Sequence, residues 1–212
     1  FEGSVGALPG RFLAGCHAVV SCLRCDEPGQ CSGLQRLLLA AAAQHGVRRF
    51  VASDFLPDYR PGLGKAAASL EAHPVLAERM AFCKELVGTD IDVVHVHAGM
   101  LLEDVCTFLR VWDGDKRQLQ CYGDPEQRFD LSTVAAVATA TAAAVMDPRL
   151  GDRDEYGTHV CVSSAAVSAL EMHQVLSSFA PSALAVGTLG DLVSRIEQAR
   201  GLERLVLQCQ RV

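Results

Sequence analysis

The stretch Ala18-Val19-Val20-Ser21-Cys22-Leu23 decides the fold of this chain. It is short, apolar and partly β-branched, and polar residues bound it, which is typical of a strand buried on both faces of a parallel sheet. Strong helix formers fill residues 34–45, Gly46 stands where a left-handed helix cap is needed, and residues 49–52 form the next apolar run. Strand, helix and strand within about 35 residues predict a βαβ unit whose two strands lie parallel.

The same alternation continues along the chain. Residues 74–87 have the apolar spacing of a helix, and residues 91–96 form the third predicted strand. Further strands are predicted at 118–122 and 158–162, and further helices at 131–146, 169–179 and 189–199. We therefore predict an α/β fold. Residues 1–98 would form part of a Rossmann-like, doubly wound parallel sheet. Residues 99–212 would form a smaller C-terminal α+β region for a substrate or partner, interleaved with the sheet.

Composition excludes several classes of partner. The 212 residues carry a formal net charge of -6, and the Arg48-Arg49 pair is the longest basic cluster, so a surface that neutralises nucleic-acid phosphates is not expected. No apolar stretch approaches the roughly 20 residues of a membrane span, and no signal peptide is visible, which favours a cytoplasmic protein. The nine cysteines are an odd number, which excludes a complete set of internal disulfides and favours reduced thiols.

Two pairs of residues have spacings that metal sites also use. Cys22 and Cys25 are separated by two residues, and His95 and His97 alternate so that both imidazoles share one face of the predicted strand. Neither pair has a second close pair of ligands, since Asp92 falls on the other face of that strand. A buried thiol that packs like Ala and two hydrogen-bonded histidines explain the patterns more simply. We predict no metal site.

Four segments between residues 13 and 148 resemble, in this order, motifs of the NmrA-like and isoflavone-reductase-like atypical short-chain reductases. They are residues 13–21, similar to L-x-G-x-D-A-V-x-S; residues 35–55, similar to Q-x-x-L-I-x-A-A-x-x-A-G-V-K-R-F and then P-S-[DE]-F; residues 96–104, similar to V-R-P-G-F-F-M-E-N; and residues 122–148, similar to Y-G-D-G and F-x-x-V-x-D-I-A with a final D-P. The chain departs from these motifs at His17, where Asp is usual, and at Ala52, where Pro is usual. The order and spacing of the four motifs make the resemblance specific.

The resemblance implies NADP(H) as the cofactor and a cleft at the carboxyl ends of the parallel strands. The cofactor contacts that it implies are Ser21, Cys22, Leu23, Arg24, Gln35, Ser53, Asp54, Phe55, His97, Ala98 and Gly99. The family's pyrophosphate-binding turn, G-x-x-G-x-x-G, does not precede Ala18, since Gly3-Ser4-Val5-Gly6 has no apolar strand before it. Its absence argues against NADP(H) binding by this chain alone. An alternative for Ser53 and Asp54 is that they only cap a turn.

The resemblance also implies that the chain is N-terminally truncated, with Phe1 near the end of the third strand of the family's sheet. The strand at residues 18–23 would then lack its natural neighbour and expose an apolar edge. We expect such an edge to aggregate or to pair with a second copy in an edge-strand dimer.

The proton donors of the family are not matched in this sequence. Reductases of this group use a Lys where this chain has Arg79, and an Arg stays protonated at any working pH. Tyr59 and His97 remain as unorthodox acids. The absent donor favours an NADP(H)-sensing regulator that acts on a protein partner. The alternative is an NADPH-dependent reductase of small carbonyl or phenylpropanoid-like substrates, and a third reading is a truncated copy with only a scaffold role.

Overall fold

The computed structural model describes residues 12–23, 29–60, 74–106 and 111–198. Its contacts divide the chain into two compact units. The first comprises residues 1–97 and 137–162, and the second comprises residues 98–136 and 163–212. Each unit is thus built from two separate parts of the sequence.

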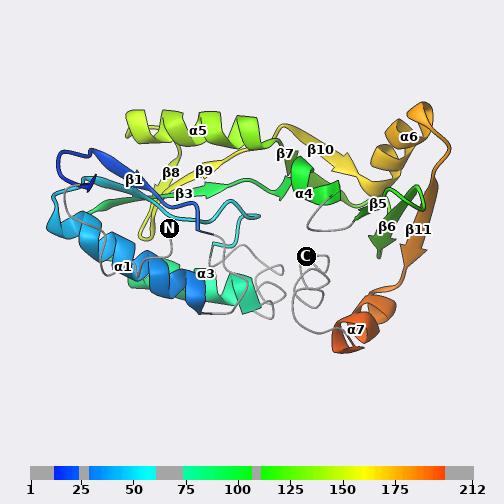
Figure 1. The fold of residues 1–212 in the computed structure, drawn as a ribbon, viewed down its shortest axis with the longest axis horizontal. Helices are drawn as coiled ribbons and strands as arrows, with labels where there is room; N and C mark the ends of the chain where they lie inside the picture. The colour runs from blue at the N-terminus through cyan, green and yellow to red at the C-terminus, as the bar shows by residue number, and fades with distance from the viewer. Residues whose placement is uncertain (1–11, 24–28, 61–73, 107–110, 199–212) are drawn as a thin grey trace. The chain divides into compact units, whose positions relative to one another are not determined.

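A five-stranded sheet forms the centre of the first unit (Figure 1). Its strands, in spatial order, are β1 (Ala18–Val20), β2 (Arg49–Val51), β3 (Asp92–His97), β9 (Gly157–Cys161) and β8 (Asp152–Asp154). The first four strands are parallel, and β8 is antiparallel to β9. The predicted α/β class with a parallel, Rossmann-like sheet is therefore confirmed.

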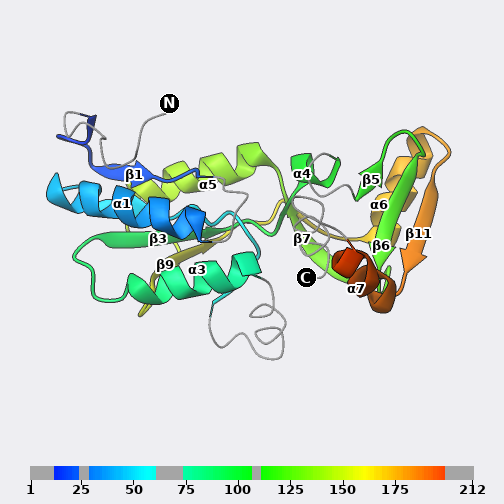
Figure 2. The same ribbon diagram turned by 60° about the horizontal axis from the view of Figure 1, so that its bottom comes forward.

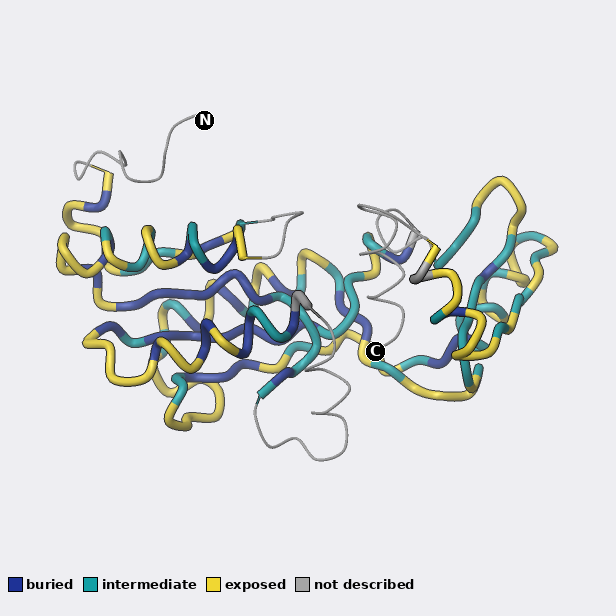
Figure 3. The backbone as a smooth tube through the Cα atoms, turned by 90° about the horizontal axis from the view of Figure 1, so that it is seen from below, coloured by how far each residue is buried: buried dark blue, intermediate teal, exposed yellow. Residues whose placement is uncertain are grey.

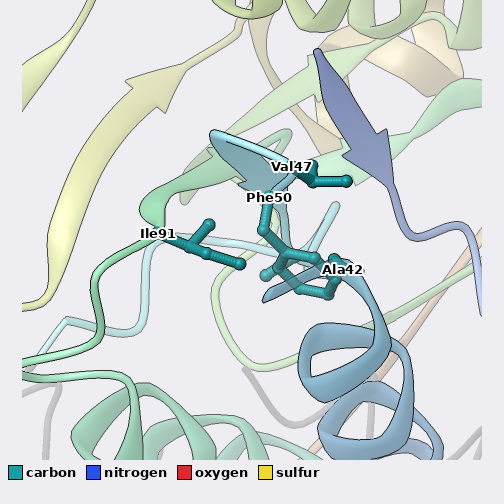
Figure 4. Packing of buried hydrophobic residues seen from close by; sticks show 5 residues of the cluster. Ala42, Val47, Phe50 and Ile91 are labelled. Atoms are coloured by element: carbon teal, nitrogen blue, oxygen red, sulfur yellow. The ribbon is translucent and has the colours of Figure 1, made fainter. Parts of the chain in front are cut away.

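Helices cover both faces of this sheet. They are α1 (Gln30–Gln44), α3 (Pro74–Glu85) and, from residue 137 on, α5 (Val134–Met146). In Figures 1 and 2, α1 and α3 lie side by side on one face and contact each other, whereas α5 lies on the other face. Phe50 of β2 is fully buried and packs with Ala42 of α1, Val47 and Ile91 (Figure 4). This apolar cluster fixes α1 on the sheet.

Strand β1 differs from its prediction in length and in burial. We predicted a strand at residues 18–23 that is buried on both faces, whereas β1 ends at Val20, and Val20 is 41% exposed. β2 and β3 lie in the interior of the unit (Figure 3). Within the described residues only β2 pairs with β1, so that β1 is an edge strand. The prediction of full burial is wrong because one side of β1 has no neighbouring strand there.

Helix α1 begins at Gln30 rather than at the predicted Leu34. Gly29 at its N-cap has no capping side chain. Instead the Glu78 carboxylate of α3 accepts hydrogen bonds from the backbone N–H groups of Gly29 and Ser32, each at 2.8 Å, and from the Ser32 hydroxyl at 2.7 Å. A carboxylate from another helix thus stabilises the first turn of α1 and extends it.

The second unit contains two three-stranded sheets. One has the order β10 (Ala165–Ser168), β7 (Arg128–Ser132), β4 (Met100–Leu101), and the other the order β11 (Ala183–Gly187), β6 (Gln118–Tyr122), β5 (Trp112–Asp113). Its helices are α4 (Leu102–Cys106), α6 (Ala169–Phe179) and α7 (Leu189–Gln198). The predicted helix at 131–146 is wrong at its start, because residues 128–132 pair with β4 and β10. Among the described residues, none of the helices combines the length and apolar character that a bilayer span requires.

Candidate functional site

The carboxyl ends of β1, β2 and β3 lie next to one another in the first unit. The Ser21 N–H donates to the Val51 carbonyl at 2.9 Å, and the Phe55 N–H donates to the Val96 carbonyl at 3.0 Å. Ligands of open α/β folds bind at this edge of the sheet. The residues after these three strands are therefore brought together in the way that parallel strands require.

Gln35 and Ser53 tie these strand ends to α1. The side-chain Oε1 of Gln35 accepts a hydrogen bond from the Ser53 backbone N–H at 2.6 Å, and the Ser53 hydroxyl donates to the Leu23 carbonyl at 2.7 Å. Gln35 and Ser53 are both buried. Their polar groups are engaged within the protein and hold the residues after β1 against those after β2.

Asp54 lies in the interior and has two side-chain partners. Its Oδ2 is 2.7 Å from Nδ1 of His95, and its Oδ1 accepts a hydrogen bond from the Tyr59 hydroxyl at 2.5 Å. The side chains of Asp54 and His95 are each 1% exposed. A buried carboxylate is tolerated when it is paired and hydrogen-bonded, and both oxygens of Asp54 meet this requirement.

Two further imidazole rings, those of His97 and His159, stack with the His95 ring of this pair. The His159 ring on β9 lies 4.8 Å from that of His95 and 5.2 Å from that of His97, with interplanar angles of 14° and 6°. His97 Nε2 is 2.9 Å from His159 Nδ1, and His159 Nε2 is 3.0 Å from a carboxylate oxygen of Asp154. His159 was not among the site residues predicted from the sequence. It meets the other rings because it pairs in register with His95 across β3 and β9.

The surroundings give His95 and His97 opposite protonation states. Burial alone would lower the pKa of His95, but its hydrogen bonds to Asp54 and Cys83 raise that pKa to about 10. Burial lowers the pKa of His97 to about 4, against the attraction of the carboxylates of Asp58 and Asp54. Burial opposes the charge on Asp54, yet the hydrogen bond from His95 lowers the pKa of Asp54 overall. At neutral pH, Asp54 is a carboxylate, His95 is a cation and His97 is a neutral ring.

The three candidate acids are not arranged to give a proton to a carbonyl oxygen. Tyr59 is 1% exposed, its hydroxyl donates to Asp54, and burial together with that carboxylate raises the pKa of Tyr59 well above its usual value. His97 is buried, neutral and hydrogen-bonded to His159. Arg79 is buried on α3, and a guanidinium is a poor proton donor.

The other residues implied by the resemblance are Cys22, Arg24, Ala98 and Gly99. Ala98 and Gly99 belong to the second unit. Gly99 has a φ of +63°, and a Cβ on it would lie 2.6 Å from the Asp130 carbonyl oxygen, so backbone packing alone requires glycine there. Cys22 is exposed, and Arg24 lies outside the described residues.

Within the described ranges, no group of three or more His, Cys, Asp or Glu side chains could hold a metal ion. The facing nitrogens of His97 and His159 hydrogen-bond to each other instead. The cysteines whose side chains the structure describes are free thiols.

No model of a protein family matches the sequence, and no curated protein does. Solved structures match the fold. The crystal structure of an isoflavone reductase aligns with a TM-score of 0.75 at 13% identity, over 98% of this chain and 67% of its own. This chain has the isoflavone reductase fold.

Two further structures support this assignment at the level of the fold. The leucoanthocyanidin reductase of Vitis vinifera, in a binary complex with NADPH, aligns with a TM-score of 0.72 at 15% identity, over 99% of this chain and 67% of that structure. A nucleoside-diphosphate-sugar epimerase from Staphylococcus aureus aligns with a TM-score of 0.67 at 17% identity, over 95% of this chain and 67% of the epimerase. The chain thus spans about two thirds of the length of these proteins.

The described residues at the carboxyl ends of β1, β2 and β3 do not themselves supply the groups that hold the pyrophosphate of a dinucleotide. At the ends of β2 and β3, the polar side chains of Ser53, Asp54 and His97 are buried and paired within the protein. Among the described residues at these strand ends, Ser21 Oγ and His97 Nδ1 are buried without a hydrogen-bond partner. Neither atom brings the positive charge or the row of backbone N–H groups that holds a pyrophosphate.

Proposed function

We propose that this protein is an NAD(P)-binding regulator that senses the redox state of its cofactor, or another non-catalytic protein with the fold of the NAD(P)-dependent reductases. The state of the candidate proton donors carries the proposal. Carbonyl reduction needs an acid that reaches the substrate oxygen and has a pKa near the working pH. The Tyr59 hydroxyl donates its hydrogen bond to Asp54 and has a pKa well above its usual value, because it is buried beside that carboxylate. His97 is neutral at pH 7 and has no acidic proton to give, so neither residue meets both conditions.

A protein of this kind acts by binding. A small molecule or NADP(H) would be its ligand, and a protein partner would respond to the bound state. The edge of β1, where Val20 is exposed, supports pairing with a second copy of the chain. Sedimentation velocity checks this pairing, because a chain that stays monomeric at high concentration would exclude it.

The alternative function is an NADPH-dependent reductase of small carbonyl or phenylpropanoid-like substrates. It is supported by the printed names of two structural neighbours, an isoflavone reductase and a leucoanthocyanidin reductase. In that case the proton would have to come from Tyr59 or His97 after a rearrangement, or from water.

One pair of measurements separates the two functions. NADPH binding is followed by the change in its fluorescence, and NADPH consumption is followed by absorbance with a panel of small carbonyl compounds. We expect no consumption above the rate without protein. Sustained turnover would overturn the proposal, and its loss in Tyr59→Phe but not in His97→Gln would identify Tyr59 as the acid.

A further inference from the structure

Arg79 is a buried cation with unused donor nitrogens. The residue is 7% exposed on α3, and its Nε and Nη1 atoms have no hydrogen-bond partner in the described part of the chain. A buried charge without an acceptor is costly, and native proteins rarely leave one in place. Such an arginine indicates a ligand.

Arg49 shows how a structural arginine is accommodated in the same unit. It is 5% exposed, its Nε donates to Asp92 Oδ2 at 2.9 Å, and its Nη2 pairs with the same carboxylate. Its Nη1 donates to the Ala144 carbonyl at 2.5 Å. All three nitrogens of Arg49 therefore have partners, whereas Nε and Nη1 of Arg79 have none.

Among the described residues, the groups on which the charge of Arg79 acts already have other partners. The charge of Arg79 acts on Tyr59 and Glu78. The Glu78 carboxylate, however, is bound to the N-terminus of α1 through Gly29 and Ser32. The Tyr59 hydroxyl donates its hydrogen bond to Asp54.

Apolar side chains share the helix face that carries Arg79. Leu76 and Cys83 lie at helical spacings of three and four residues from it, and both pack with Tyr59 and Met80 in one buried cluster. An anionic group bound by Arg79 would therefore adjoin apolar surface.

We propose that Arg79 binds the oxyanion, carboxylate or phosphate, of a small molecule that also carries an apolar body. A guanidinium is planar, stays charged and pairs with both kinds of oxyanion through its fork of N–H donors. The adjoining apolar cluster favours a ligand whose charge is confined to one end. This inference rests on the proposed function, because it names the ligand class of a protein that acts by binding.

The test titrates the full chain with inorganic phosphate and, separately, with benzoate, and follows the heat of binding and the thermal unfolding midpoint. We expect at least one anion to bind and to raise the midpoint, and the stronger of the two identifies the oxyanion. Arg79→Met should lose about tenfold or more in affinity, the size of one charge-assisted hydrogen bond. Arg79→Lys should retain part of it. Arg36→Met is the control, since Arg36 is exposed and paired with Glu85.

Stability without ligand provides a second readout. Arg79→Met should be at least as stable as the wild type, because Nε and Nη1 of Arg79 have no hydrogen-bond partner to lose, whereas Arg49→Met should be much less stable. If Arg79→Met lowered the free energy of unfolding as much as Arg49→Met does, the proposal would be overturned. Equal anion binding by wild type and Arg79→Met, or none by the wild type, would overturn it too. NADPH turnover would contradict the proposed function and leave these results unaffected.

Discussion

Asp54 and His95 form an ion pair in the interior of the first unit, with Oδ2 and Nδ1 2.7 Å apart. The pair joins the end of β2 to the middle of β3, and the second oxygen of Asp54 accepts the Tyr59 hydroxyl. Burial lowers the pKa of His159, and the charge on His95, whose ring stacks on it, lowers that pKa further. The first predictions concern this network.

Asp54→Asn should destabilise the protein by about 3–5 kcal/mol, because it leaves a buried imidazolium without its counter-ion. Urea unfolding at neutral pH measures the loss. Asp58→Asn is the control, since Asp58 is only half-buried and pairs with Arg60, and it should cost about 1 kcal/mol or less. Asp54→Asn/His95→Gln should be more stable than Asp54→Asn alone. Equal losses in the Asp54 and Asp58 single variants would argue against the ion pair.

The protein should become less stable at alkaline pH, where His95 loses its proton. Its pKa is about 10 in the folded state, above the ordinary 6.5, so between these values the folded state binds a proton that the unfolded state has lost. The stabilisation is complete below about pH 6.5 and disappears as pH rises through about 10. Urea unfolding across this range should show the decline in wild type and a flatter profile in His95→Gln. Profiles of equal slope would contradict the assignment.

The protein should become less stable in acid, where the buried His97 must take up a proton. Its pKa is about 4 in the folded state, so between 6.5 and 4 the unfolded state binds the proton first. The contribution of the neutral His97 ring to stability is therefore complete above about pH 6.5 and is lost as the pH falls through about 4. His159, Asp58 and Tyr59 face this ring, and Asp54 adds its own loss at lower pH because its pKa is also lowered. His97→Gln should shift the pH midpoint of acid unfolding to a lower value. An unchanged midpoint would show that other groups cause the loss of stability in acid.

Glu78→Gln should weaken the link between α1 and α3 by about 1 kcal/mol, because three donors at the start of α1 lose a charged acceptor. Glu85→Gln on the same helix is the matched control. Glu85 also contacts α1, through Arg36, but in an exposed ion pair that should contribute less than about 0.5 kcal/mol. Hydrogen exchange of the first turn of α1 should accelerate in Glu78→Gln alone. Equal exchange in both variants would show that the cap does not hold this turn.

The sequence predicted what depends on local pattern. The periodicity of residues 34–45 and the apolar runs at residues 49–52 and 91–96 predicted α1, β2 and β3 and their parallel order, because these signals lie within each element. Parallel order in turn predicted that the ends of β2 and β3 meet. Long-range contacts were not predictable in this way. The exposed side of β1 depends on which strands flank it, and the start of α1 depends on Glu78 from another helix.

The residues of the candidate site also divide into those that local pattern predicted and those that depend on long-range contacts. Asp54 and His97 were identified because they directly follow or end predicted strands. The partnership of Asp54 with His95 was not foreseen, and His159 was overlooked, because the register of β3 against β9 decides both which rings stack and which carboxylate is in reach. The alternating histidine in the predicted strand at 158–162 was the available signal.

Gly99→Ala tests whether this glycine serves a ligand or the fold. A Cβ there would meet the Asp130 carbonyl oxygen at 2.6 Å and would also require a left-handed conformation, so we expect a loss on the order of 3 kcal/mol in urea unfolding. Gly46→Ala is the matched control, because Gly46 has a similar φ of +71° but open space around it, and it should cost only about 1 kcal/mol. The difference between the two variants isolates the steric contact with Asp130. If Gly99→Ala were as stable as Gly46→Ala and lost only ligand binding, the glycine would belong to a binding site, as the family motif implies, and not to backbone packing.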